Sequence, residues 1–225
     1  MKSDEPKAVK IPIGNAEHVS GLFQAPPTPR ACFVFAHGAG AGMNHAFMTA
    51  IAAGLAGRGI ATLRFQFAYM EKGSKRPDSP KIAHAAVRAA VSVASRLAPG
   101  IPLYAGGKSF GGRMTSQAQA LEPLRGVHGL IFLGFPLHPA GKPSKERADH
   151  LFDILIPMLF LQGTRDELAE LGLLQDVCDG LGTRATLKLF QEADHSFHVP
   201  AHSGRNDAQV QSELLDTFVG WLTAN

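Results

Sequence analysis

The chain has 225 residues, of which 45% are hydrophobic and 18% are charged, and its formal net charge is +3. These values are ordinary for a globular protein and exclude a disordered chain. The Lys and Arg residues are scattered along the sequence, so the charge indicates no nucleic-acid partner. No apolar stretch reaches the ~18 residues that a membrane-spanning helix needs, and residues 1–10 lack the apolar segment of a signal peptide. We therefore expect a single cytoplasmic domain over residues 1–225, without a membrane partner.

Short apolar strands alternate with longer helical segments along the chain. Residues 7–23, with Gly14-Asn15 in the middle, predict an antiparallel edge hairpin. Further strands are expected at 31–36, 60–67, 101–105, 127–135, 158–162 and 186–191, and helices at 44–57, 79–97, from the turn at 109 to about 121, and at 207–222. This alternation predicts right-handed crossovers and a parallel sheet, in which ligands collect at the carboxyl ends of the strands.

The two cysteines, Cys32 and Cys178, fall in an apolar run and in a helical stretch. Both positions favour buried thiols over a disulfide bridge. The pair is also too sparse for a zinc site.

The strongest motif is Gly107-Lys108-Ser109-Phe110-Gly111, a G-x-S-x-G sequence placed directly after a predicted strand and at the start of a helix. In that context a sharp turn holds the serine in strained geometry, and its hydroxyl projects above the sheet. The flanking glycines are needed because neighbouring backbone passes close by. A glycine-rich turn with an N-capping serine would explain the pentapeptide equally well. Whether Ser109 is a nucleophile therefore depends on whether the sequence also contains an acid, a base and an oxyanion-binding loop at the expected positions.

Two phosphate-binding motifs are superficially similar to these turns. A P-loop would need a glycine at the position of Pro102, which lies inside a predicted strand. A dinucleotide fingerprint starting at Gly38 would need a small residue where Met43 stands, and an acidic residue after the next strand. Neither motif fits.

An ester-cleaving serine needs hydrogen-bond donors where negative charge develops on the carbonyl oxygen. The turn His37-Gly38-Ala39-Gly40 follows a strand in the order expected for the loop that supplies one such donor. We assign this role to the N–H of Ala39, with Gly38 as the alternative. The second donor would be the N–H of Phe110, just after the nucleophile and at a helix N-terminus.

The acid and the base should follow the serine in the chain order Ser, Asp, His. Asp166 lies at the carboxyl end of a predicted buried strand and is the expected acid, with Glu167 as the alternative. An aspartate at this position could also serve only as an exposed helix N-cap, without a catalytic role. His195 follows the last strand at short range, with His198 as the alternative, whereas Asp194 is expected to point elsewhere. Three signals in the right order favour catalysis by Ser109, His195 and Asp166.

Five motifs carry a resemblance to a known family. They are His37-Gly38-Ala39-Gly40, and the runs 106–114, 134–139, 160–166 and 194–197. The chain resembles an α/β hydrolase over essentially its whole length. It is more closely similar to a small subgroup related to dienelactone-hydrolase-like proteins and to the hydrolase-like subunit of the NSL histone acetyltransferase complex. The resemblance implies an eight-stranded, mostly parallel sheet whose second strand is antiparallel.

The function expected from these residues is that of a serine hydrolase of the carboxylesterase type, which cleaves a small acyl ester, thioester or amide. This chemistry needs neither a metal nor a cofactor, so we expect none. Some relatives are interaction modules rather than enzymes, so a binding module for a peptide or protein partner is the alternative. The segment between Gly134 and Ile156 is too short for a helical cap domain, which predicts an open site. Its substrate-binding residues are expected to be Gly38, Phe135 and His138, although the last two could equally pack the loop.

Basic residues also occur in two loops near the expected rim of the site. They are Lys72, Lys75 and Arg76 in one loop and Lys142, Lys145 and Arg147 in the other. They could create a positive field that favours anionic substrates. Most charged loop residues are simply exposed to solvent, so we expect these six residues to form ordinary solvated loop surface.

Overall fold

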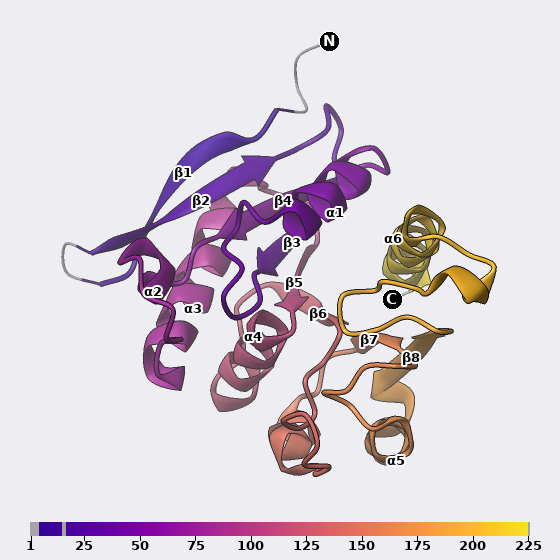
Figure 1. Cartoon of the computed structure of the whole chain (residues 1–225). Helices are drawn as coiled ribbons and strands as arrows, with labels where there is room; N and C mark the ends of the chain where they lie inside the picture. The colour runs from indigo at the N-terminus through magenta and orange to yellow at the C-terminus, as the bar shows by residue number, and fades with distance from the viewer. Residues whose placement is uncertain (1–4, 15–16, 225) are drawn as a thin grey trace.

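The computed structural model describes residues 5–14 and 17–224, whose centre is one eight-stranded sheet in the order β1-β2-β4-β3-β5-β6-β7-β8 (Figure 1). The strands are β1 (Lys7–Pro12), β2 (His18–Gln24), β3 (Ala31–Ala36), β4 (Ile60–Phe65), β5 (Leu103–Lys108), β6 (Val127–Leu133), β7 (Met158–Gly163) and β8 (Ala185–Phe190). Strand β2 pairs antiparallel with both β1 and β4, and the remaining neighbours pair parallel. The predicted sheet with an antiparallel second strand is confirmed. Asn15 of the predicted hairpin turn lies outside the described residues.

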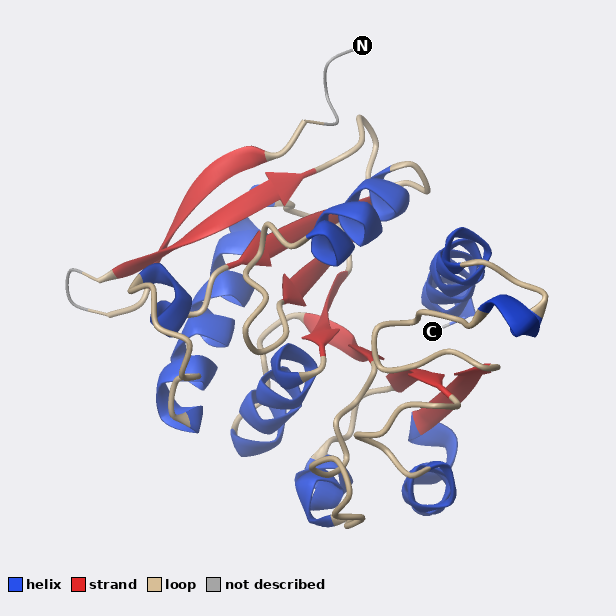
Figure 2. Cartoon of the chain, viewed as in Figure 1, coloured by secondary structure: helices blue, strands red, loops and turns tan. Residues whose placement is uncertain are grey.

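Helices cover both faces of the sheet (Figure 2). They are α1 (Ala46–Ala56), α2 (Ala68–Glu71), α3 (Pro80–Leu97), α4 (Phe110–Leu121), α5 (Leu171–Leu181) and α6 (Asp207–Ala224), with short 3-10 helices η1 (Glu146–Asp153), η2 (Gly182–Arg184) and η3 (Ala201–Ser203). Helices α1 and α6 pack on one face, whereas α3, α4 and α5 pack on the other.

Alternation within the central strands explains why two apolar layers form. Strand β3 is buried at every position. Phe33 and Phe35 point into the core under α1 and α6, while Cys32, Val34 and Ala36 point into the core under α3 and α4. A strand covered on both faces can be apolar throughout, which is the pattern seen here.

The connection between β6 and β7 contains only the 3-10 helix η1. It forms no separate cap domain, as its length predicts. Within the described ranges, none of the helices combines the length and the apolar character required to cross a lipid bilayer.

Both cysteines are buried free thiols, as predicted. Burial raises the pKa of Cys32 and of Cys178 to about 12, so both thiols stay protonated at neutral pH. A protonated, buried thiol is a poor nucleophile, which leaves these side chains with a packing role.

Candidate active site

Ser109 occupies the sharp turn between β5 and α4. Its backbone has φ 50° and ψ −119°, and it is one of three non-glycine residues with positive φ in the described part of the chain. Such a conformation costs about 1–3 kcal/mol and persists only where the surroundings enforce it. Hydrogen bonds hold the turn on both sides: the Ser109 N–H donates to the Leu133 carbonyl (3.2 Å), and its carbonyl accepts from the Arg113 N–H (3.1 Å).

The flanking glycines are required by close approach of strand β3. A Cβ atom on Gly107 would lie 2.3 Å from the Ala36 carbonyl oxygen, and one on Gly111 would lie 2.5 Å from the His37 carbonyl oxygen. Both distances are far inside van der Waals contact with backbone that cannot move aside. The G-x-S-x-G spacing therefore follows from the packing of β3, β5 and α4.

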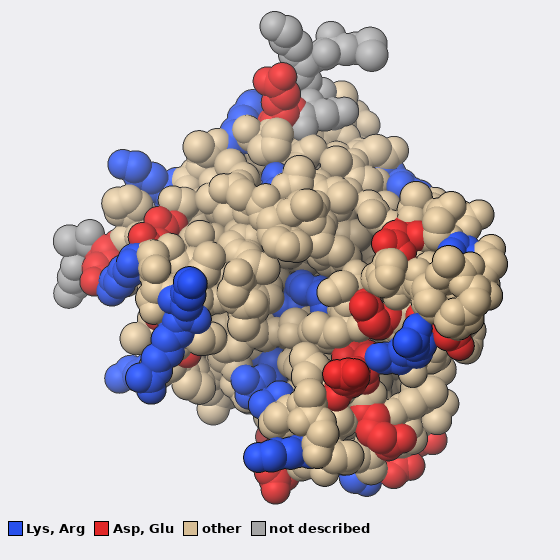
Figure 3. All heavy atoms as spheres, viewed as in Figure 1, with Lys and Arg blue, Asp and Glu red and all other residues tan. Residues whose placement is uncertain are grey.

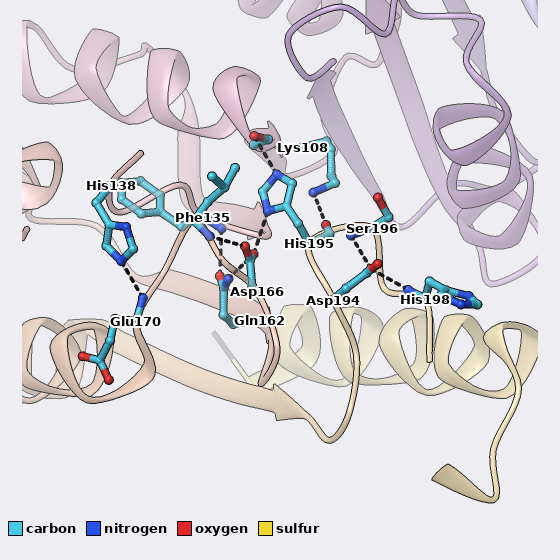
Figure 4. Close-up of polar contacts among 12 residues, drawn as sticks. Lys108, Phe135, His138, Gln162, Asp166, Glu170, Asp194, His195, Ser196 and His198 are labelled. Atoms are coloured by element: carbon cyan, nitrogen blue, oxygen red, sulfur yellow. Dashed lines mark hydrogen bonds and ion pairs between the residues drawn. The ribbon is translucent and has the colours of Figure 1, made fainter. Parts of the chain in front are cut away.

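The structure brings Ser109, His195 and Asp166 together from three separate loops. His195 Nε2 lies 2.9 Å from Ser109 Oγ, and His195 Nδ1 lies 2.6 Å from Asp166 Oδ2. Figure 4 shows the imidazole between the carboxylate and a hydroxyl. Because a carboxylate can only accept, the Nδ1–H donates to Asp166 and the Nε2 lone pair faces Ser109.

Asp166 is fixed by two further donors. Gln162 Nε2 donates to Asp166 Oδ2 (2.5 Å), and the Leu168 N–H donates to Oδ1 (2.8 Å). Gln162 is itself oriented, because its Oε1 accepts from the Phe135 N–H at 2.9 Å (Figure 4). No role for Gln162 was predicted from the sequence. The feature of the sequence that marks Gln162 is a polar amide at the end of the otherwise apolar strand β7, where the structure buries it fully.

The alternatives for the acid and the base lie elsewhere. His198 Nδ1 lies 2.9 Å from Asp207 Oδ2 on the surface, and its side chain is 63% exposed. Hydrogen bonding to Asp207 raises the pKa of His198. Asp194 turns away from Ser109, and its Oδ1 accepts from the backbone N–H groups of Ser196 (2.7 Å) and His198 (2.9 Å). Glu167 makes no hydrogen bond to His195 among the described residues.

Two backbone N–H groups flank Ser109 with their hydrogen-bonding capacity unused. Neither the Ala39 N–H nor the Phe110 N–H donates to another described residue. Phe110 opens α4, where the first N–H groups of a helix have no intrahelical acceptor. The Gly38-Ala39 turn lies against the serine, since a Cβ on Gly38 would be 3.7 Å from Ser109 Cβ.

His37 holds the Gly38-Ala39 turn in place. Its Nδ1–H donates to the Gly38 carbonyl (2.8 Å), and its Nε2 accepts from the Phe67 N–H (3.1 Å). Burial lowers the pKa of His37, which favours the neutral ring that this pair of bonds requires. His37 thus links the loop after β3 to the loop after β4.

Lys108, inside the motif, supports the His195 loop. Its Nζ donates to the His195 carbonyl (2.5 Å) and lies 5.7 Å from the centre of the Phe197 ring. Figure 4 shows this ammonium reaching the loop beside His195. Burial lowers the pKa of Lys108 to about 8, against the opposing effect of Asp166 and Asp194. The sequence offers no signal for this role, because the position is variable within the motif pattern.

The lowered pKa of Lys108 predicts a pH-dependent stability. Folded Lys108 releases its proton at a pH of about 8, whereas the ordinary value is 10.5, so the free energy of unfolding should rise with pH between these values. We expect wild type to gain about 2 kcal/mol over Lys108→Met between about pH 7 and pH 9.5 in denaturant titrations. The exposed Lys81→Met variant should follow the wild-type profile. Parallel curves for wild type and Lys108→Met would contradict the assignment.

Two of the expected substrate-binding residues line neither of the cavities that contain Ser109. Phe135 is fully buried, and its ring packs against Phe132 and Phe160 in the core. His138 is buried as well, where its Nδ1–H donates to the Pro139 carbonyl (2.9 Å) and its Nε2 accepts from the Glu170 N–H (2.7 Å) (Figure 4). Both side chains pack the loop after β6, which corrects the expectation that they line the pocket. Gly38 does lie at the serine.

Ser109 opens onto two cavities. One has a volume of about 400 Å³ and includes Ala39, Phe110, Arg113 and Arg147 in its lining. The other has a volume of about 550 Å³, and its lining includes the apolar side chains of Ala41, Phe47 and Met48. Figure 3 shows a hollow in the middle of this face with basic atoms inside it and below it, while acidic side chains gather to one side.

The described residues contain no cluster of three or more His, Cys, Asp or Glu side chains arranged to hold a metal ion. The groups that converge on Ser109 are instead an imidazole, a carboxylate and backbone N–H donors. Such a set can move a proton and stabilise an oxyanion.

The sheet order, the strained turn after β5 and the missing cap define the fold as that of an α/β hydrolase. A model of the α/β hydrolase domain family matches residues 29–223, so the chain belongs to this family.

Solved structures of the same fold are similar over nearly the whole chain. The dienelactone hydrolase from Anabaena variabilis has a TM-score of 0.79 at 17% identity, with 99% of this chain and 98% of that chain covered. A serine hydrolase without a lid from Xanthomonas campestris has a TM-score of 0.75 at 22% identity, with 96% and 95% covered. Est1E from Butyrivibrio proteoclasticus, with ferulic acid bound, has a TM-score of 0.71 at 17% identity, with 93% and 98% covered. At these identities the likeness establishes a shared fold.

Proposed function

We propose that this protein is a serine hydrolase that cleaves a small acyl ester, or a related thioester or amide, through an acyl-enzyme on Ser109. The observation that carries the proposal is the hydrogen-bonded chain from Ser109 Oγ through His195 to Asp166, with distances of 2.9 and 2.6 Å. Both lie within the range needed for proton transfer and for fixing a tautomer.

In the first half of the proposed reaction, Ser109 Oγ attacks the carbonyl carbon while His195 Nε2 takes the hydroxyl proton. The N–H groups of Ala39 and Phe110 stabilise the oxyanion, because they have no other acceptor among the described residues. The imidazolium then gives its proton to the departing alcohol oxygen. The carbon–oxygen bond breaks, and the acyl group stays on Ser109.

In the second half, water attacks the acyl-enzyme and His195 accepts the water proton. The second tetrahedral intermediate collapses, His195 returns the proton to Ser109 Oγ, and the carboxylic acid leaves. The Asp166 carboxylate stabilises the imidazolium in each half. The structural neighbours named as serine hydrolase and dienelactone hydrolase support ester chemistry on this fold.

A binding module on the same fold would need none of this alignment. The strained Ser109 backbone and the second support of Asp166 by Gln162 favour catalysis, because strain of this kind is retained where function requires it.

The proposal is tested by assaying the purified protein with p-nitrophenyl esters from acetate to octanoate. We expect turnover well above the buffer rate, with a preference for short acyl chains because both cavities are small. A protein that folds, by circular dichroism, but hydrolyses no ester in the series would contradict the proposal and favour the binding module.

A further inference from the structure

Two arginines line the cavity that contains Ser109. Arg113 lies one helical turn after the serine on α4, and Arg147 lies on η1 across the cavity. The two guanidinium groups approach closely enough that the charge of Arg147 lowers the pKa of Arg113, in addition to the larger effect of burial. Figure 3 shows basic side-chain atoms beside the hollow on this face.

Neither guanidinium has a partner within the described residues. Arg113 Nε is buried without a hydrogen bond, and neither arginine forms an ion pair. The contrast with other arginines is clear, since Arg58 contacts Asp216 at 2.8 Å and Arg205 contacts Glu213 at 2.5 Å. A buried donor without an acceptor is costly, so an acceptor is expected to arrive from outside the chain.

The surroundings leave the cavity with positive charge. Asp78 is the acidic residue in its lining, but its Oδ2 accepts from the Tyr69 N–H (3.0 Å) and it pairs with neither arginine. His150 lies 2.7 Å from Ser116 Oγ on α4, and burial together with the Arg113 charge lowers its pKa to about 4, so it is neutral. Apart from Ser109, the other lining side chains are apolar, and they include Pro77, Pro80, Met114, Pro136 and Leu168.

We propose that Arg113 and Arg147 form a subsite for a substrate carboxylate, so that the preferred substrate is an ester with a carboxylate on one side of the scissile bond. This inference rests on the proposed function. A planar guanidinium matches a carboxylate through paired N–H donors, and these bonds are stronger than neutral ones. The second cavity, with Phe47 and Met48, takes the uncharged part of the ester on the other side of Ser109.

The test compares matched esters in which a carboxylate replaces an uncharged group of similar size. For the acyl side these are p-nitrophenyl hexanoate and mono-p-nitrophenyl adipate, and for the alcohol side methyl p-acetoxybenzoate and p-acetoxybenzoate. We expect wild type to favour the anionic member of at least one pair, with a preference that falls as salt is added. Arg113→Gln and Arg147→Gln should each lower the anionic-to-neutral ratio of kcat/KM about tenfold, and Arg113→Lys should lower it less.

Arg125→Gln is the matched control, because Arg125 is exposed and precedes β6 at the opposite end of the sheet from Ser109. It should leave every rate unchanged. If Arg113→Gln does not fold, Arg147→Gln carries the test alone, since η1 lies at the edge of the molecule. Hydrolysis of neutral esters with a ratio that neither Gln variant changes would overturn the subsite and leave the hydrolase intact. Failure of wild type on every ester would overturn both proposals.

Discussion

Replacing Ser109 by alanine is expected to lower kcat for ester hydrolysis by about 10⁴-fold or more. The proposed reaction forms its covalent bond at the Ser109 oxygen, and no other hydroxyl lies within hydrogen-bonding distance of His195 Nε2 among the described residues. Background hydrolysis by the remaining site would come only from substrate binding and from the free N–H groups of Ala39 and Phe110. The measurement is a progress curve with the p-nitrophenyl ester that wild type hydrolyses fastest. The concentration of Ser109→Ala is raised so that a rate about 10⁴-fold lower can still be detected.

A second variant separates chemistry from folding at the same position. Alanine keeps a Cβ in the positive-φ region, so Ser109→Ala should retain the wild-type stability, whereas Ser109→Gly should raise the free energy of unfolding by about 1 kcal/mol because glycine tolerates φ 50°. Both variants should be inactive. Substantial ester turnover by either one would show that another residue is the nucleophile.

Asp166→Asn is expected to lower kcat by about 10⁴-fold with little change in the backbone. An asparagine places its NH₂ group either toward His195 and Gln162 or toward the Leu168 N–H, and each orientation sets donor against donor. In the first orientation the imidazole is driven toward the tautomer with its proton on Nε2, where it cannot accept the Ser109 proton. The pH profile of kcat and the melting temperature should be measured together.

Glu167→Gln is the control for this prediction. Glu167 neighbours Asp166 but makes no hydrogen bond to His195 within the described chain, so its substitution should leave kcat within about twofold, as expected for a surface charge. The reverse result, with Asp166→Asn active and Glu167→Gln inactive, would move the acid to the neighbouring position.

Local sequence patterns were sufficient to predict the sheet and the three aligned residues. Strands such as β3 and β7 are apolar runs in the sequence, and the structure places buried strands at the same positions. Ser109, Asp166 and His195 each follow a strand in a parallel sheet, and the carboxyl ends of those strands meet at one edge. The geometry of the sheet therefore brings together residues that lie far apart in the chain.

Side-chain direction within loops was not predictable in the same way. Phe135 and His138 also follow a strand end, but both side chains are buried and line neither cavity that contains Ser109. The roles of His37 and Lys108 depend on contacts to other loops, which no local pattern encodes. The closer resemblance to the NSL subunit, the cytoplasmic location and the absence of a nucleic-acid partner stay predictions.

The central claim is that the Ser109 hydroxyl is activated, and covalent labelling tests it most directly. The protein is incubated with an alkyl fluorophosphonate and examined by intact mass and peptide mapping. We expect one adduct on the peptide that contains Ser109, absent from Ser109→Ala and unchanged in Ser95→Ala, which alters an exposed serine on α3. A folded wild-type protein that gains no adduct, or gains it on another residue, would show that Ser109 is not the activated nucleophile.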